Sequence, residues 1–213
     1  MLPLEPFMLA RRSRRLEEIA TRRTRNLVLV LDGVHDPHNL SAVVRSSEAF
    51  GLLDLHVVES HAPFRVHSKI SQGAEKWLDI HHHASAADCV AALTEQGLAI
   101  HVADAACSTA VDELPWERPL ALVFGNEHLG CSQAFRRAAD GRFCVPMHGF
   151  AESLNVSVAA GICLAIGVRE RIRRLGRHGD LDPAARTALV EDWRRRSVRH
   201  ADQILAHLAE RAP

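Results

Sequence analysis

Short apolar runs alternate with segments of helical spacing along most of the chain. The apolar runs predict strands at residues 27–31, 55–58, 77–81, 98–102, 120–124 and 143–145. Because these runs are largely apolar at successive positions, the strands are expected to be covered on both faces, as in parallel sheets. Apolar positions three and four residues apart predict helices at residues 39–51, 84–95, 133–139 and 153–168. The alternation indicates an α/β fold with a doubly wound, mostly parallel sheet flanked by helices.

The two ends of the chain follow a different pattern. Residues 8–25 show a thin apolar stripe among arginines, and a final amphipathic helix, interrupted near Ser197, follows Pro183. Seven arginines stand against three glutamates in residues 1–26, and eleven arginines against seven acidic residues in residues 166–213, so each end is net positive although the whole chain is neutral. We therefore divide the chain into a basic helical N-terminal extension, a central domain and a basic helical C-terminal extension, at residues 1–26, 27–168 and 169–213.

Arginine provides almost all of the positive charge, since Lys69 and Lys76 are the only lysines. Its planar fork of N–H donors suits phosphate groups. The clusters at both ends therefore predict RNA contacts by Arg11, Arg12, Arg14, Arg15, Arg22, Arg23, Arg194, Arg195 and Arg196. The alternative is that these clusters are solvated helix faces offset by nearby acidic residues, namely Glu17, Glu18, Glu191 and Asp192.

Three polar turns follow apolar strands and are the candidates for chemistry. They occupy residues 35–45, 125–130 and 146–155. Loops at the carboxyl ends of parallel strands converge on one crevice, so the three turns are expected to form one site. Asn39 stands where a helix N-cap is expected, with Arg45 nearly two turns further on, and Ser153 and Asn155 lead into the long helix. The alternative for Asn39 and Ser153 is that they only cap these helices.

Other kinds of chemistry lack support in the sequence. The five cysteines are scattered without a Cys-x-x-Cys pair, which predicts reduced thiols rather than disulfides or a zinc knuckle. Three consecutive histidines occupy residues 81–83, but neighbouring strand residues point to opposite faces, so no metal is predicted. The usual glycine-rich nucleotide motifs are missing. No apolar run approaches the roughly 20 residues of a membrane span and no signal peptide is visible, so a cytoplasmic protein is expected.

The three turns resemble the motifs of the SpoU class of RNA ribose 2′-O-methyltransferases, within the SPOUT superfamily. Residues 39–45 (NLSAVVR) resemble the first motif, residues 122–127 (LVFGNE) with Gly130 the second, and residues 145–147 (VPM) with 153–157 (SLNVS) the third. The short basic ends resemble the branch that methylates guanosine 18 in the tRNA D-loop. Relatives that act on ribosomal RNA commonly carry an additional N-terminal RNA-binding domain.

This resemblance implies the SPOUT fold, with a deep trefoil knot in the C-terminal third, and a homodimer whose subunits complete each other's sites. It also implies that S-adenosylmethionine binds in the knot, against Ala103, Asp104, Gly125, Val145 and Leu154. The pair at 103 and 104 departs from the small hydroxyl residue expected there. Catalytic or positioning roles are implied for Asn39, Arg45, Glu127, Ser153 and Asn155.

Arg45 is the family's candidate for activating the ribose 2′-hydroxyl. Arginine is ordinarily too firmly protonated to act as a base. Two roles stay open: an electrostatic clamp on the developing oxyanion, which we favour, or a general base whose proton affinity is lowered by its surroundings. The expected function is methylation of tRNA by S-adenosylmethionine. The alternatives are a 23S ribosomal RNA substrate, a catalytically inactive RNA-binding protein, and a small-molecule α/β enzyme with incidental basic ends.

Overall fold

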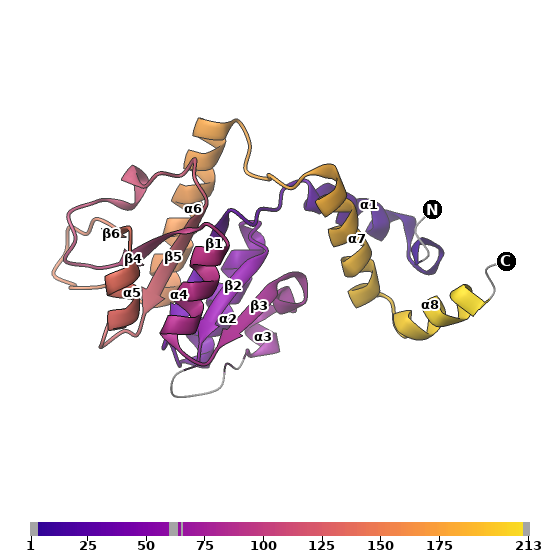
Figure 1. The fold of residues 1–213 in the computed structure, drawn as a ribbon, viewed down its shortest axis with the longest axis horizontal. Helices are drawn as coiled ribbons and strands as arrows, with labels where there is room; N and C mark the ends of the chain where they lie inside the picture. Colours follow the sequence, from indigo (N-terminus) through magenta and orange to yellow (C-terminus); the bar gives the residue numbers. More distant parts are fainter. Residues whose placement is uncertain (1–3, 60–63, 65, 211–213) are drawn as a thin grey trace. The chain divides into compact units, whose positions relative to one another are not determined.

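The computed structural model of the protein describes residues 4–59, 64 and 66–210. It contains two compact units (Figure 1). The larger unit comprises residues 24–178 and holds the sheet, and the smaller comprises residues 1–23 and 179–213 and is helical. Most of the two basic extensions predicted from the sequence thus belongs to one helical unit, while residues 24–26 and 169–178 belong to the larger unit. Among the described helices, none has both the length and the apolarity needed to cross a membrane.

A six-stranded sheet in the order β3-β2-β1-β5-β4-β6 forms the centre of the larger unit. Every strand pair is parallel, which confirms the predicted sheet. The strands are β1 (Leu27–Asp32), β2 (Asp54–Val58), β3 (Asp79–His83), β4 (Ala99–Ala103), β5 (Leu120–Gly125) and β6 (Gly141–Phe143). All residues of β1 and β2 are buried, as their apolar runs predicted.

Strand β6 lies two residues earlier than the sequence predicted. It pairs with β4 through Gly141 and Phe143, and of its three residues only Phe143 is buried. As the edge strand it has a single neighbour in the sheet, so it tolerates a glycine and an exposed arginine that sequence pattern alone would assign to a turn. Val145, expected inside the strand, instead lies in the segment that follows it.

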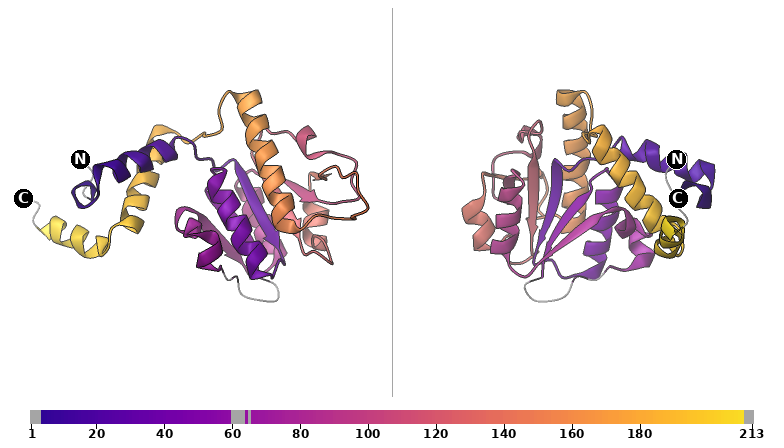
Figure 2. Two further views of the ribbon diagram at one scale, coloured as in Figure 1. Left: turned by 180° about the vertical axis from the view of Figure 1, so that it is seen from behind. Right: turned by 45° about the vertical axis from the view of Figure 1, so that its right-hand side comes forward.

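Helices cover both faces of the sheet. Helices α2 (Pro37–Ala49) and α6 (Val156–Leu175) lie together on one face (Figure 2, left), where Leu29 and Leu31 join their apolar side chains in one core cluster. Helices α4 (Ala86–Glu95) and α5 (Gln133–Ala138) contribute to a second cluster with Val28 and Val30. Alternate residues of β1 thus contribute to two hydrophobic cores, one on each face of the sheet. Shorter elements are α3 (Ser68–Ser71) and the 3₁₀ turns Ala74–Trp77 and Val111–Glu113.

Helix α2 begins before the predicted position. Asp36 is its N-cap and accepts a hydrogen bond from the His38 amide (2.9 Å), and Pro37 occupies the first helical position. The prediction that Asn39 caps this helix is therefore wrong. Proline is favoured at the first helical position because its missing N–H would have no partner there. The shift places the Asn39 side chain inside the first turn rather than in the loop.

Helix α6 is longer than predicted. It begins at Val156 with Asn155 as its N-cap, so Ser153 does not cap it, and it continues past residue 168 to end at Gly176. The predicted domain boundary at 168 thus falls inside a continuous helix. Gly176 adopts a left-handed conformation (φ 72°), a common way for helices to end, and Arg173 and Arg174 in the last turn favour the negative end of the helix dipole.

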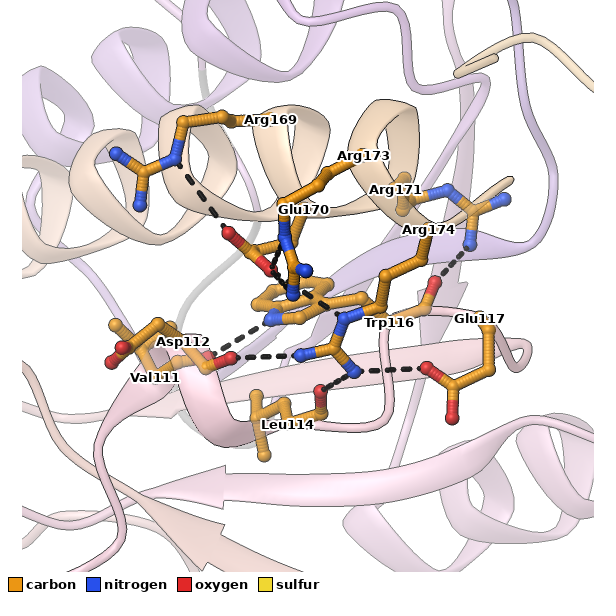
Figure 3. Close-up of polar contacts among 10 residues, drawn as sticks. All are labelled: Val111, Asp112, Leu114, Trp116, Glu117, Arg169, Glu170, Arg171, Arg173 and Arg174. Carbon is orange, nitrogen blue, oxygen red and sulfur yellow. Dashed lines mark hydrogen bonds and ion pairs between the residues drawn. The ribbon is translucent and has the colours of Figure 1, made fainter. Parts of the chain in front are cut away.

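Arginines of α6 hold the segment that follows β4 (Figure 3). Arg171 donates to the Trp116 carbonyl (3.1 Å), and Arg174 donates to the Leu114 carbonyl (3.0 Å) and to Glu117 (2.9 Å). Leu114 and Trp116 are buried, so this segment packs against the core. These contacts tie the segment between β4 and β5 to helix α6. The start of this segment, at residues 103–105, and the start of α6 both border the cavity described in the next section.

The helical unit contains α1 (Ala10–Ala20), α7 (Pro183–Ser197) and α8 (Ala201–Glu210). The break between α7 and α8 confirms the predicted interruption near Ser197. Arg194 is buried between helices α1 and α7 and donates to Ser13 and Glu17, both at 2.7 Å. Arg23 is also buried, with its guanidinium 5.2 Å from the Trp193 ring centroid. These two buried residues hold the helical unit together, which argues against the RNA contacts predicted for them.

Candidate functional site

A cavity of about 230 Å³ lies at the carboxyl ends of β4, β5 and β6, beside the start of α6. The residues predicted to contact the cofactor all line it: Ala103, Asp104, Gly125, Val145 and Leu154. Phe124, Phe143 and Val156 are buried and give the cavity apolar walls. Glu127 and Ser153, two of the predicted catalytic residues, also line it. Two of the three predicted turns, at residues 125–130 and 146–155, therefore meet at this cavity.

The loop after β5 folds back tightly on itself. The Gly130 amide donates to the Asn126 carbonyl (2.8 Å), and the Asn126 side-chain oxygen accepts from the His128 and Leu129 amides. Gly130 has a positive φ of 67°. A Cβ on Gly125 would lie 2.1 Å from the Gly130 carbonyl carbon, so only glycine permits this close approach of backbone to backbone. The loop thus presents rigid backbone groups to the cavity.

Two further contacts attach this loop to the end of β1. Asp32 is buried and its carboxylate accepts from the Ser132 amide at 2.6 Å. The Asn126 side chain donates to the Gly33 carbonyl (3.2 Å). Sequence reasoning did not identify Asp32 or Asn126 as part of the site. The signal that could have identified Asp32 is its place at the end of a continuously apolar strand. A carboxylate there is expected to be buried and therefore to need a hydrogen-bond partner.

Three cysteine thiols at the cavity are poor nucleophiles. Burial raises the pKa of Cys131 and that of Cys163 to about 12. Burial also raises the pKa of Cys144, which lies beside Cys107. The thiolate is the nucleophilic form, so at neutral pH these side chains stay protonated and act as small apolar wall groups. With these thiols protonated, the cavity favours direct transfer between two bound reactants over a covalent cysteine intermediate.

Asn39 joins two of the three loops. Its amide nitrogen donates to Glu127 (2.8 Å), and its amide oxygen accepts from the Asn155 side chain (2.9 Å). The Asn155 oxygen in turn accepts from the amides of Ser157 and Val158 and from the Ser157 hydroxyl (2.6 Å). Because each amide side chain uses its donor and its acceptor, the network fixes their orientations. Ser157 belongs to the third motif but was not predicted as a site residue.

The structure does not bring Arg45 into this network. It lies on α2 two turns beyond the network's Asn39, is exposed, and forms no hydrogen bond or ion pair with any residue that the structure describes. In particular, Arg45 forms no ion pair with Glu48, three residues further along α2. Arg45 is also not among the residues lining the cavity. Asn39, Glu127, Ser153 and Asn155 therefore lie together in one chain, and Arg45 lies apart with its guanidinium available.

Residues 26–165 match the model of the SpoU rRNA Methylase family. The chain belongs to this family. It is 36% identical over 188 residues to a tRNA (guanosine(18)-2′-O)-methyltransferase of Thermus thermophilus. The alignment covers 87% of this chain and 96% of the Thermus protein. It is 40% identical over 153 residues to the 23S rRNA (guanosine-2′-O-)-methyltransferase RlmB of Nitrosomonas europaea, covering 70% of this chain and 58% of the relative.

Solved structures of the SpoU family share the fold. The Aquifex aeolicus TrmH/SpoU tRNA modifying enzyme superimposes with a TM-score of 0.80 at 30% identity, covering 89% of this chain and 98% of that one. The SpoU methyltransferase AviRb of Streptomyces viridochromogenes, solved in complex with AdoMet, gives a TM-score of 0.63 at 27% identity and covers 74% of this chain and 65% of AviRb. Family membership therefore rests on both sequence and structure.

Proposed function

We propose that this protein transfers a methyl group from S-adenosylmethionine to the ribose 2′-hydroxyl of guanosine 18 in the D-loop of tRNA. The observation that carries the proposal is the similarity to the Thermus tRNA methyltransferase, which covers 87% of the chain and so extends beyond the central domain into the helical unit. The Nitrosomonas relative matches only 70% of the chain and supports a ribosomal RNA substrate as the second candidate.

The cavity fits the proposed cofactor. Its apolar walls, formed in part by Phe124 and Val156, suit an adenine ring, and the glycine loop offers backbone groups at close range. When bound there, S-adenosylmethionine supplies an electrophilic methyl group. We also infer the SPOUT trefoil knot for the C-terminal part of the sheet unit. The position of β4 between β5 and β6, with α6 returning to pack beside α2, supports this inference.

The side chains around the cavity supply orientation rather than covalent chemistry. The Asn39 network holds Glu127 at the cavity rim, where its carboxylate is placed to orient the substrate ribose. A hydroxyl is a weak nucleophile at neutral pH, so charge must be stabilised as its proton leaves. The Arg45 guanidinium is the candidate for this task as an electrostatic clamp.

Arg45 reaches a reaction centre most simply in a homodimer whose subunits complete each other's sites. The outer face of α6 supports such a dimer. Val158 and Ile172 are 50% and 49% exposed and lie on one side of this helix, since fourteen residues correspond to nearly four turns. Exposed apolar side chains that line up on one helix are typical of interfaces. We therefore propose that α6, adjoining the Arg45-bearing α2, forms the subunit interface.

Replacing both Val158 and Ile172 by arginine is expected to convert the dimer to a monomer and to lower methyl transfer at least tenfold. The physical reason is that two charges at the centre of the interface would have to be desolvated without partners. Sedimentation velocity measures the mass in solution. Leu208→Arg, at an exposed leucine of α8 in the helical unit, is the control and should leave the mass unchanged. An unaltered dimer in the double variant contradicts the proposed interface.

We propose that tRNA contacts the exposed arginines of α1. Arg11, Arg12, Arg14 and Arg15 form no ion pair with any described residue. Arg22, Arg195 and Arg196, which were also predicted to bind RNA, are instead paired with Glu18, Asp202 and Asp192. An arginine that is already paired with a carboxylate gains less binding free energy from a phosphate contact. The unpaired arginines of α1 are therefore expected to dominate the binding.

Substituting glutamine for all four arginines at positions 11, 12, 14 and 15 is expected to weaken tRNA binding and reduce its salt dependence. Each lost phosphate contact lowers the slope of log affinity against log salt by about 0.7–0.9. Filter binding at several salt concentrations measures this slope. Arg22→Gln is the matched control, since Arg22 is already paired with Glu18 at 2.6 Å. Equal losses in the control and the fourfold variant would contradict the assignment.

The test of the function is transfer of a labelled methyl group from S-adenosylmethionine to an unmodified tRNA transcript, followed by mapping of the modified nucleotide. A ribose methyl on guanosine 18 is the expected result. Methylation of 23S rRNA fragments alone would keep the chemistry and replace the substrate. tRNA binding without transfer would favour the inactive RNA-binding protein, and salt-insensitive binding would favour a small-molecule enzyme.

A further inference from the structure

A second cluster of reactive side chains lies on the other half of the sheet, away from the cavity. His56 in β2 is paired in register with His81 in β3, and Val58 with His83. His56, His81 and His83 face the side covered by α4, where the buried Cys89 lies. His82 points to the opposite face, as strand alternation requires. The three consecutive histidines thus do not form a site by themselves, but His56 and Cys89 complete one with His83.

The donor atoms of this cluster are close enough to share one ion. One donor atom each from His56, His83 and Cys89 lies within 4.8 Å of the others. The His56 Nδ1 and His83 Nε2 atoms are 2.9 Å apart. Tetrahedral zinc would place two ligand nitrogens about 3.4 Å apart and a nitrogen and sulfur about 3.6 Å apart, from the usual bond lengths. Small side-chain adjustments, on the order of 1 Å, therefore convert the cluster to a coordination sphere.

The burial of His56 is the second observation that favours a ligand. Its side chain is fully buried, and its Nδ1 atom lies against the His83 Nε2 rather than against solvent. Cys89 is equally buried, in a helix that has no other sulfur. Two imidazoles and one thiol are the donors preferred by zinc and its first-row neighbours rather than by magnesium or calcium.

His81 and Asp54 lie around the cluster, where residues that support metal ligands are commonly found. His81 stacks on His56 with ring centroids 4.5 Å apart, and its Nε2 lies 2.7 Å from the buried carboxylate of Asp54. Asp54 thereby holds His81 in place beside His56, and its charge is also paired with Arg25. Because β3 is the edge strand of the sheet and His83 is only partly buried, an ion can enter from the side.

We propose that His56, His83 and Cys89 bind a zinc-type divalent cation that fastens α4 to the edge of the sheet. On binding, the Cys89 thiol releases its proton to solvent and the thiolate sulfur and one nitrogen from each imidazole donate electron pairs to the ion. The fourth position is taken by water or by His81. The site is structural and separate from the methyl-transfer cavity. It departs from the sequence-based expectation that the protein binds no metal.

Cobalt(II) added to the metal-stripped full-length protein provides the probe. We expect one equivalent to bind, with the thiolate-to-cobalt charge-transfer band and the intense visible bands of tetrahedral cobalt. Cys89→Ser should abolish the charge-transfer band, and His83→Gln, at a partly exposed residue, should weaken binding at least tenfold. Zinc should displace cobalt and raise the thermal unfolding temperature of wild type.

The matched control is His82→Gln, which changes a histidine of the same triplet on the opposite face, where it contacts Glu59. It should bind cobalt like wild type. The proposal is overturned by a charge-transfer band that survives in Cys89→Ser, by equal losses in His82→Gln and His83→Gln, or by the absence of any bound cobalt in folded wild type. Circular dichroism of each variant separates loss of the site from loss of the fold.

Discussion

Replacing Arg45 by alanine is expected to lower the rate constant for methyl transfer to tRNA by about 10²–10³-fold, the range found when a group that stabilises a developing oxyanion is removed. Arg45 is exposed and has no ion-pair partner among the described residues, so its loss should not destabilise the fold. Cofactor affinity should also be unchanged, because Arg45 does not line the cavity. Single-turnover methylation and titration calorimetry measure these two quantities.

Arg45→Lys distinguishes the two roles considered for this residue. A clamp depends on positive charge, so lysine should recover part of the lost rate without shifting the pH profile. A general base would be replaced by a group of lower pKa, and the pH dependence of the rate would move. Arg137→Ala, at an exposed arginine of α5, is the control. Full activity of Arg45→Ala would remove this residue from the mechanism.

Gly125→Ala is expected to abolish measurable binding of S-adenosylmethionine and to lower the free energy of unfolding by about 1–3 kcal/mol. The added Cβ would lie 2.1 Å from the Gly130 carbonyl carbon and 2.2 Å from the Cys131 amide nitrogen. These are backbone atoms, so the loop itself must move, and with it one wall of the cavity. Calorimetric titration with the cofactor and urea denaturation measure the two effects.

Gly149→Ala is the matched control for this loop substitution. Gly149 lies in the turn before α6, a Cβ there would meet nothing within 4 Å, and its backbone does not have the positive φ that penalises alanine. Cofactor affinity and stability should both equal those of wild type. If Gly125→Ala binds the cofactor normally, the loop after β5 does not form the cofactor wall.

The sequence by itself determined the layers of the fold. Continuous apolar runs such as residues 27–31 became fully buried parallel strands, because a run without polar positions has no face that tolerates water. The polar turns that follow such strands were identified for the same reason, and their meeting at one edge followed from the parallel arrangement. Residue roles at the site came from the family resemblance, and all of them stay predictions.

The sequence misplaced the start of a helix where two nearby residues could each serve as its N-cap. Asp36 and Asn39 are both good N-caps, and the helix begins at the one that precedes a proline. Likewise Ser153 and Asn155 could each cap α6, and Asn155 does so while its amide nitrogen donates to Asn39, 116 residues away. The choice depends on a partner that only the folded chain brings into reach.

Tertiary structure alone decided which arginines are buried and which are exposed. Arg194 and Arg195 are adjacent and chemically identical, but Arg194 meets Ser13, 181 residues away, and Arg195 remains exposed. Helical rotation of about 100° per residue turns one side chain into the α1 contact and the other outward. The histidine cluster arose in the same way, since His56 and Cys89 are distant in sequence from one another and meet only through strand register and helix packing.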